Sequence, residues 1–212
     1  MIELAVGPAR VAFTTRPDGD LGRTDPGAPV AAARERVRRA LGLEAIAAGW
    51  QVHGARVATV AAAGPGYVVA AAPADGQATG LPGVGVAVHA ADCLPIALAG
   101  PGGVAMVHAG WRGLAAGVVA AGVAALGELG VAGSLEAAIG PGAGGCCYEV
   151  GDEVRAAFAG VPGAVVGQRV DLKAVARFEL DRAGVARIGD VGLCTICAPA
   201  CFSHRRDGPA TG

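Results

Sequence analysis

Three side chains in this sequence have the types and surroundings of ligands for a catalytic metal ion. They are His53, Cys93 and His108, which stand in polar or turn-like contexts from which a side chain can enter a cleft. Two imidazoles and one thiolate suit Zn²⁺, and three protein ligands leave a fourth position for water or substrate. Cys93 follows His53 by 40 positions and precedes His108 by 15, so the three would meet only in the folded chain. Residue types alone leave open a buried cysteine beside two hydrogen-bonded histidines.

The chain has six cysteines, and three of them stand close together near its end. Cys194, Cys197 and Cys201 form a Cys-x2-Cys-x3-Cys pattern, which leaves redox chemistry and a second metal site open. Residues 1–10 lack the basic start and apolar run of an export signal. We therefore expect reduced thiols or metal ligands rather than disulfides, in a soluble cytoplasmic protein.

Short strands and helices are expected to position these residues. Val84–His89, Leu94–Ala99 and Val104–His108 are apolar runs between turn signals, which predicts buried strands. Gly110–Leu129 is apolar nearly all round, which predicts a buried helix that is too short to span a bilayer. Further strands are expected at Glu3–Val6, Val11–Thr15, Trp50–His53, Val57–Val60 and Leu135–Ile139, and helices at Val30–Leu43, Asp152–Phe158 and Asp171–Ala183, the last with Asp171 as N-cap.

Three segments are expected to be mainly irregular. Pro17–Pro29 is a polar loop, Gly64–Gly83 is a long connection with one strand at Tyr67–Ala70, and Val191–Gly212 is a tail rich in Cys and Arg. No repeat, linker or charge block divides the chain. We therefore predict an α+β fold, a single domain over residues 1–212 in which buried short strands are flanked by helices.

Composition excludes several classes of protein. The chain has 212 residues, of which 53% are hydrophobic and 17% charged, so it is neither disordered nor an acidic tail. Its net charge of −1 argues against nucleic-acid binding through a basic surface. The expected partners are small molecules, with no nucleic acid and no membrane, and the expected state is a monomer or small homo-oligomer.

The sequences around the three candidate ligands resemble those of one family, and the resemblance extends over essentially the whole chain. Residues 51–54 (Gln-Val-His-Gly), 91–96 (Ala-Asp-Cys-Leu-Pro-Ile) and 107–113 (Val-His-Ala-Gly-Trp-Arg-Gly) resemble motifs of the laccase-domain family, also called the YfiH-like or polyphenol-oxidase-like purine nucleoside phosphorylase family. Further matches occur at residues 13–16, Asp75 with Thr79, 139–141, 147–151, 194–195, 202–208 and Thr211-Gly212.

The resemblance implies a fold, an activity and a metal. It implies that zinc is held by His53, Cys93 and His108, and that the protein is a purine nucleoside phosphorylase with adenosine deaminase and methylthioadenosine phosphorylase activities. The implied substrates are a purine nucleoside and phosphate. The implied fold is a mixed α/β sandwich similar to the catalytic domain of cytotoxic necrotizing factors. Copper is the alternative cofactor, because older names in the family refer to laccases.

Other residues are candidates for binding substrate or assisting the metal ligands. Arginine matches two phosphate oxygens at once, so we expect Arg112, beside His108, to bind phosphate, with Arg205 next. Asp92 is a candidate for orienting a ligand imidazole or accepting a proton, although a turn-forming Asp fits equally well. Gln51 is a candidate for holding a base edge. The remaining candidates are Arg16, Arg34 and Arg206 for phosphate and Trp111 for stacking on the base, with core packing favoured for Trp111.

The chain departs from the family pattern at several positions. Ala33, His89 and His204 replace the usual Asn, Thr and Tyr, and His89 is close enough in sequence to Cys93 to add a ligand or crowd the site. Three other functions stay open. The first is a thiol hydrolase acting on amides, as in editing of peptidoglycan precursors, with Cys93 as nucleophile and His108 or His53 as base. The second is a non-enzymatic metal-binding module, and the third is a copper-dependent polyphenol oxidase, for which four histidines are few.

Overall fold

An antiparallel hairpin, β8 (Leu94–Gly100) and β9 (Gly103–Ala109), forms the centre of the computed structural model. The structure describes residues 1–22 and 27–208. Part of the expected loop at 17–29 and the Thr211-Gly212 match lie outside the described residues. The hairpin belongs to a six-stranded sheet with the order β13-β10-β8-β9-β6-β4, which also contains β4 (Val57–Thr59), β6 (Gly76–Thr79), β10 (Glu136–Ile139) and β13 (Arg187–Asp190).

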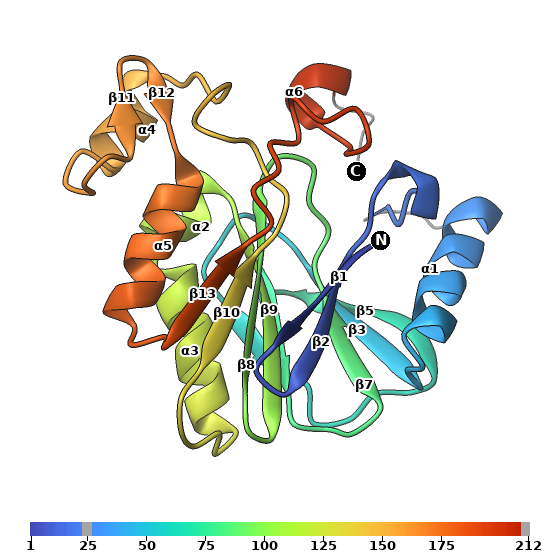
Figure 1. The fold of residues 1–212 in the computed structure, drawn as a ribbon. Helices are drawn as coiled ribbons and strands as arrows, with labels where there is room; N and C mark the ends of the chain where they lie inside the picture. The colour runs from blue at the N-terminus through green and yellow to red at the C-terminus, as the bar shows by residue number, and fades with distance from the viewer. Residues whose placement is uncertain (23–26, 209–212) are drawn as a thin grey trace.

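Smaller sheets and helices complete a mixed α/β domain (Figure 1). Its parallel three-stranded sheet has the order β5-β3-β7. The remaining bounds are β1 (Ile2–Val6), β2 (Ala9–Phe13), β3 (Ala45–Trp50), β5 (Gly66–Pro73), β7 (Val84–Ala87), β11 (Val165–Val166), β12 (Arg169–Val170), α1 (Ala28–Ala40), α2 (Trp111–Ala115), α3 (Val118–Glu128), α4 (Asp152–Ala157), α5 (Leu172–Arg182) and α6 (His204–Asp207), with a 3-10 turn at Arg16–Asp18.

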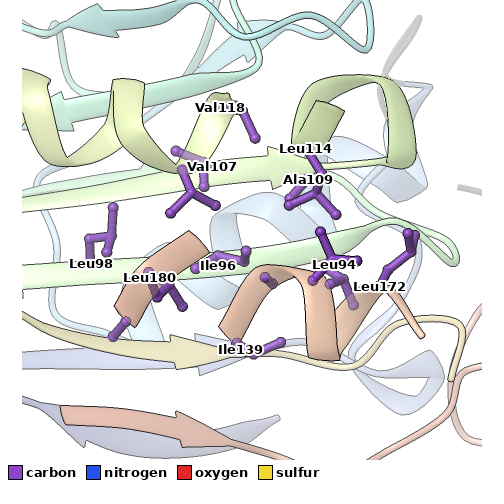
Figure 2. Packing of buried hydrophobic residues seen from close by; sticks show 14 of the residues in the cluster. Leu94, Ile96, Leu98, Val107, Ala109, Leu114, Val118, Ile139, Leu172 and Leu180 are labelled. Atoms are coloured by element: carbon purple, nitrogen blue, oxygen red, sulfur yellow. The ribbon is translucent and has the colours of Figure 1, made fainter. Parts of the chain in front are cut away.

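Both faces of the central hairpin are covered, which explains why its strands are apolar at nearly every position, with His108 of β9 as the exception. Leu94, Ile96 and Leu98 of β8 point to the face covered by α2, α3 and α5, where Figure 2 shows them packed with Leu180. The alternate residues, such as Ala97, pack under the β1–β2 hairpin on the opposite face. Burying one Leu or Ile side chain contributes about 1.5–3 kcal/mol, so these contacts fix the hairpin firmly.

The expected strands of the central region are confirmed, and two neighbouring predictions are wrong. Gly110–Leu129 is not one helix, because Gly117 has φ +85° and separates α2 from α3. Residues 64–83 form two strands, β5 and β6, where one was expected. β5 contains the strand expected at Tyr67–Ala70, whereas β6 was not expected, because Gly76–Thr79 has weak strand propensity and its pairing with β9 decides its structure.

Sequence patterns also misplaced parts of the periphery. The strand expected at Trp50–His53 lies earlier, at Ala45–Trp50. The tail is not wholly irregular, because His204–Asp207 forms the short helix α6. Asp171 is the N-cap of α5 as predicted, since its side chain accepts hydrogen bonds from the backbone amides of Lys173 and Ala174. No helix in the described ranges has the length and apolar character needed to cross a bilayer.

Candidate metal and catalytic site

His53, Cys93 and His108 converge as the sequence predicts. Their ligand atoms all lie within 4.8 Å of one another. The two imidazoles meet edge to face, with ring centroids 4.9 Å apart and planes at 77°. His108 is buried, Cys93 is half-buried and His53 is exposed, so the cluster is anchored in the core and open to solvent on one side.

Strand register brings the ligands together. Cys93 immediately precedes β8, and His108 lies near the end of β9, opposite Pro95. Antiparallel pairing therefore places both side chains at the same end of the hairpin. His53 arrives from the loop after β3, and the residue that ties this loop to β9 is Asp75, just before β6.

Asp75 has a role at the site that sequence reasoning did not assign. Its carboxylate is fully buried and accepts hydrogen bonds from the backbone amides of Val52, His53 and Gly54 at 3.1, 2.8 and 2.8 Å. It also lies 2.9 Å from Nδ1 of His108. A carboxylate at Nδ1 fixes the ring and directs Nε2 to a metal. The family match of Asp75 was the only signal, because its 33-residue separation from His108 says nothing about contact.

The protonation states of these groups are shifted by one another. Burial raises the pKa of Asp75, but hydrogen bonds from His108 and the loop amides outweigh it and lower the pKa overall. Burial opposes ionisation of Cys93 too, yet hydrogen bonds to His108 and His53 bring its pKa to about 6. Burial lowers the pKa of His108, but its hydrogen bonds to Asp75 and Cys93 outweigh burial and raise that pKa to about 9. Both shifts favour a thiolate at Cys93 and an imidazolium at His108.

Backbone strain and a glycine shape the site. His53 and Asp92 have φ values of +61° and +90°, and no other non-glycine residue in the described ranges has a positive φ. Both residues stand at the ligands, where strain of this kind is often found in functional sites. A Cβ at Gly110 would lie 2.9 Å from the Cys93 sulfur, so only glycine lets the chain turn from β9 into α2 beside this thiol.

Asp92 does not orient a ligand imidazole, and Asp75 occupies that position instead. The Asp92 carboxylate accepts hydrogen bonds from the Thr195 hydroxyl at 2.5 Å and from the Arg205 amide at 2.7 Å. It therefore joins the turn before Cys93 to the C-terminal segment. This contact spans more than 100 residues and could not be read from the sequence.

The structure separates the five candidate arginines into two groups. Arg16 binds Asp207 and the Cys201 carbonyl, Arg34 binds the carbonyls of residues 21 and 22, and Arg206 binds the carbonyls of residues 195, 196, 198 and 201. These three guanidinium groups thus hold the fold together. Arg205 donates to the Glu149 carbonyl at 2.9 Å and lies 5.3 Å from the Tyr148 ring centroid.

Arg112 is the arginine most available to a ligand. It is exposed, lies 4.4 Å from the Trp111 ring centroid, and donates to no carboxylate or carbonyl among the described residues. Trp111 itself packs partly buried against the main core, as expected. Tyr148, which lies in the matched segment 147–151, is half-buried, and its pKa is raised first by burial and second by the charge of Cys93.

Gln51 and His89 form a structural pair beside the ligands. The Gln51 side chain donates to the His89 carbonyl and accepts from its amide, both at 2.7 Å. The His89 Nε2 lies 2.8 Å from the Tyr67 hydroxyl. His89 is not part of the ligand cluster, and Gln51 is engaged with backbone.

A cavity of about 580 Å³ lies between the β1–β2 hairpin and strands β7–β9. Its walls are mostly apolar and include Phe13, Tyr67 and Phe202. The three candidate metal ligands are not among its described lining residues. The cavity and the ligand cluster are therefore separate features of the molecule.

The cysteines of the tail do not group as their spacing suggests. Cys201 is buried apart, whereas Cys194 and Cys197 meet Cys146 and Cys147, with all four sulfurs within 4.8 Å of one another. All six cysteines are free thiols. The structure thus contains two groups of residues that could hold a metal ion.

Comparison with known proteins agrees with this architecture. The chain is 40% identical over 194 residues to a purine nucleoside phosphorylase of Streptomyces coelicolor, covering 86% of this chain and 79% of that protein. It is 42% identical over 199 residues to a purine nucleoside phosphorylase of Xylella fastidiosa, covering 85% and 75%. The crystal structure of YlmD from Geobacillus stearothermophilus superposes with a TM-score of 0.75 at 33% identity, covering 87% and 77%.

The sequence pattern of one family extends over nearly all of the chain. The family described as multi-copper polyphenol oxidoreductase laccase matches residues 15–212, which include all three candidate ligands. The chain belongs to this family.

Proposed function

We propose that this protein is a zinc-dependent purine nucleoside phosphorylase that also deaminates adenosine and phosphorolyses methylthioadenosine. The observation that carries the proposal is the convergence of His53, Cys93 and His108 at a site open to solvent. The relatives named purine nucleoside phosphorylases support enzymatic activity and the substrate class.

The residues present fit a zinc ion. Two imidazoles and a thiolate of lowered pKa are the donors zinc prefers, and Asp75 leaves the Nε2 of His108 available. Zinc fits better than the several copper ions of a true laccase, because His89 and His204, the two remaining histidines, lie outside the cluster. When bound with an open position, the ion would supply Lewis acidity to the reacting nucleoside.

The chain's own residues account for the other needs of phosphorolysis. A phosphate oxygen bonds to ribose C1′ while the bond from C1′ to the purine nitrogen breaks, and the base leaves with the electron pair and takes up a proton. We propose that Arg112 binds the phosphate, because its guanidinium is exposed, belongs to the helix that follows His108, and lies over the Trp111 ring. Arg205 extends the positive charge from the C-terminal segment.

Deamination needs no phosphate and so does not require Arg112. A water oxygen bonds to purine C6 and ammonia leaves. Asp75 keeps the His108 ring in place during either reaction, and the exposed side of His53 admits the nucleoside.

The test measures metal and turnover on protein purified without a metal-affinity tag. We expect about one equivalent of zinc at this site, adenine and ribose 1-phosphate from adenosine with phosphate, and inosine without phosphate. Cys93→Ala should abolish both activities, whereas Cys201→Ala, a matched cysteine outside the site, should retain them. Turnover that survives complete metal removal would contradict the proposal.

One observation favours a second candidate, a thiol hydrolase acting on amide bonds. Cys93, His108 and Asp75 form a nucleophile, base and orienting carboxylate in series, with the thiol already ionised near neutral pH. The Cys93 sulfur would attack the carbonyl carbon, and His108 would give a proton to the nitrogen as the amine leaves. Water would then cleave the resulting thioester, releasing the acid and restoring the Cys93 thiol. Chelators distinguish the two candidates, because they should leave this activity intact and abolish the phosphorylase.

A further inference from the structure

Four cysteines from two distant loops meet beside the candidate active site. Cys146 and Cys147 lie in the loop between β10 and α4, and Cys194 and Cys197 lie in the segment after β13. Their sulfurs are all within 4.8 Å of one another. The two loops run together because β10 and β13 are parallel neighbours, so their C-terminal ends reach the same edge of the sheet.

The sulfur spacing fits one tetrahedral ion. Zinc–thiolate bonds of about 2.3 Å in a tetrahedron place the sulfurs about 3.8 Å apart. The sulfurs of Cys146 and Cys197 are 3.8 Å apart, and those of Cys147 and Cys197 are 3.1 Å apart. Small rotations about the side-chain bonds of Cys147 would open the shorter distance to the value required.

The backbone around the cysteines is arranged to support thiolate ligands. The Gly144 amide donates a hydrogen bond to the Cys194 sulfur at 3.3 Å. A Cβ at Gly144 would lie 3.2 Å from the Cys146 sulfur and 3.1 Å from the Cys194 Cβ, so a larger residue would crowd both thiols. Cys194 begins a turn in which Ala198 donates to its carbonyl, and this turn returns Cys197 toward Cys194.

We propose that Cys146, Cys147, Cys194 and Cys197 bind one zinc ion as a structural site separate from the His53–Cys93–His108 centre. Four thiolates fill a tetrahedral ion and leave no open position, which is the property of structural zinc. The thiols lose their protons to solvent as the ion binds. Two cationic groups are bonded to the loops that would carry the resulting negative charge: Arg169 donates to the Cys146 carbonyl, and Arg206 donates to the carbonyls of residues 195, 196 and 198.

The site would fasten two walls of the candidate active site to each other. Cys147 is followed by Tyr148, and Cys194 by Thr195, whose hydroxyl donates to Asp92 beside Cys93. Arg205 bridges the same two segments through the Glu149 carbonyl. An ion at the cysteines would therefore hold Tyr148 and Asp92 in register, without touching the substrate.

The test counts zinc in full-length protein purified with reductant, without chelator and without an affinity tag. The double variant Cys194→Ser/Cys197→Ser should lose one equivalent of zinc relative to the wild type, whereas the matched variant Cys201→Ser should lose none. His53→Ala should keep the cluster ion even if it loses the other. In the cobalt-substituted protein, the double variant should reduce the thiolate charge-transfer absorbance about fivefold, from five sulfur ligands to one.

A measurement on the wild type avoids dependence on the variants' folding. The four thiols should react slowly with a chromogenic thiol reagent while zinc is bound and rapidly after chelation, with zinc released in step. Equal reactivity with and without zinc would overturn the proposal, as would equal zinc content in the wild type and the double variant. So would a disulfide between Cys147 and Cys197 that forms in excess zinc. If the histidine centre binds no metal, the wild type should still contain one equivalent of zinc, and the double variant should contain none. The proposal for the four cysteines and the proposed function can therefore fail independently.

Discussion

His108 can serve a metal ion only if one of its nitrogens is held and the other is left free. Asp75 provides this constraint. Its Oδ1 contacts His108 Nδ1 and accepts from the His53 amide, and its Oδ2 accepts from the neighbouring amides of Val52 and Gly54, so a single buried carboxylate positions two of the three ligands. The buried carboxylate thus matters more to the site than Asp92, the acidic residue adjacent to Cys93 in sequence.

Asp75→Asn tests this role. The amide cannot match the carboxylate's charge-assisted hydrogen bond to Nδ1, and loss of such a partner typically lowers metal affinity by about 10–100-fold. Competition with a chromogenic chelator measures the affinity. Asp92→Asn is the control, because its partners are Thr195 and Arg205 rather than a ligand ring. Equal affinities in the two variants would show that Asp75 does not position the ligand.

Arg112→Ala tests the proposed phosphate site. Hydrogen bonds to charged groups contribute about 1.5–3 kcal/mol, so the ratio of phosphorolysis to deamination should fall about tenfold or more. Steady-state rates with varied phosphate give the ratio and the KM for phosphate. Arg182→Ala is the matched control, since Arg182 is exposed and also lies over an aromatic ring, 5.6 Å from the centroid of Phe178. An unchanged ratio in Arg112→Ala would place the phosphate elsewhere.

At the scale of elements, strand register decides which residues meet. The apolar runs Leu94–Ala99 and Val104–His108, each bounded by turn signals, were sufficient to predict β8 and β9. The sequence of β6 gave no such pattern, because Gly76–Thr79 has weak strand propensity and forms a strand through its pairing with β4 and β9. The prediction of a single helix after Gly110 was wrong for a different reason. Gly117 adopts a positive φ between α2 and α3, and this conformation depends on how the two helices pack.

Two glycines near α3 should respond in opposite directions to alanine. Gly117 has φ +85°, where a Cβ costs about 1–2 kcal/mol, so Gly117→Ala should lower the free energy of unfolding. Gly127 lies inside α3 with no atom near its missing Cβ, so Gly127→Ala should raise it by about 0.5–1 kcal/mol. Urea denaturation measures both. Stabilisation by Gly117→Ala would mean that α2 and α3 form one helix in solution.

At the scale of the whole molecule, the C-terminal segment joins the two ends of the chain and forms one side of the site. Arg16 reaches Asp207 and the Cys201 carbonyl, and the Arg16 amide donates to the Ala200 carbonyl at 2.8 Å. Farther along, Arg205 donates its amide to Asp92. The segment therefore couples the N-terminal hairpin to the turn before Cys93.

Acid should release this segment through Asp207. Its hydrogen bond to Arg206, with smaller contributions from Ser203 and Arg16, lowers the Asp207 pKa from 3.8 to about 2. A carboxylate whose pKa is lower in the folded state than in the unfolded state stabilises the fold. This stabilisation is fully present well above the unfolded-state pKa and is lost as the pH falls toward the folded-state pKa of about 2. The wild type should thus have a higher Tm than Asp207→Asn at pH 6, and the difference should shrink between pH 5 and pH 3. A difference that stays constant over that range would exclude the ionised carboxylate as its source.

The sequence by itself determined the central strands and helices α1, α4 and α5, because hydrophobic patterning and capping are local properties, and the resemblance of its motifs to one family named the three candidate ligands. Tertiary structure alone decided that Asp75 contacts His108, that Asp92 faces the C-terminal segment, and that Cys146 and Cys147 join Cys194 and Cys197 in place of Cys201. Contacts of this kind depend on which strands pair and in what register. Burial across the whole sheet sets that register, and no spacing along the chain encodes it.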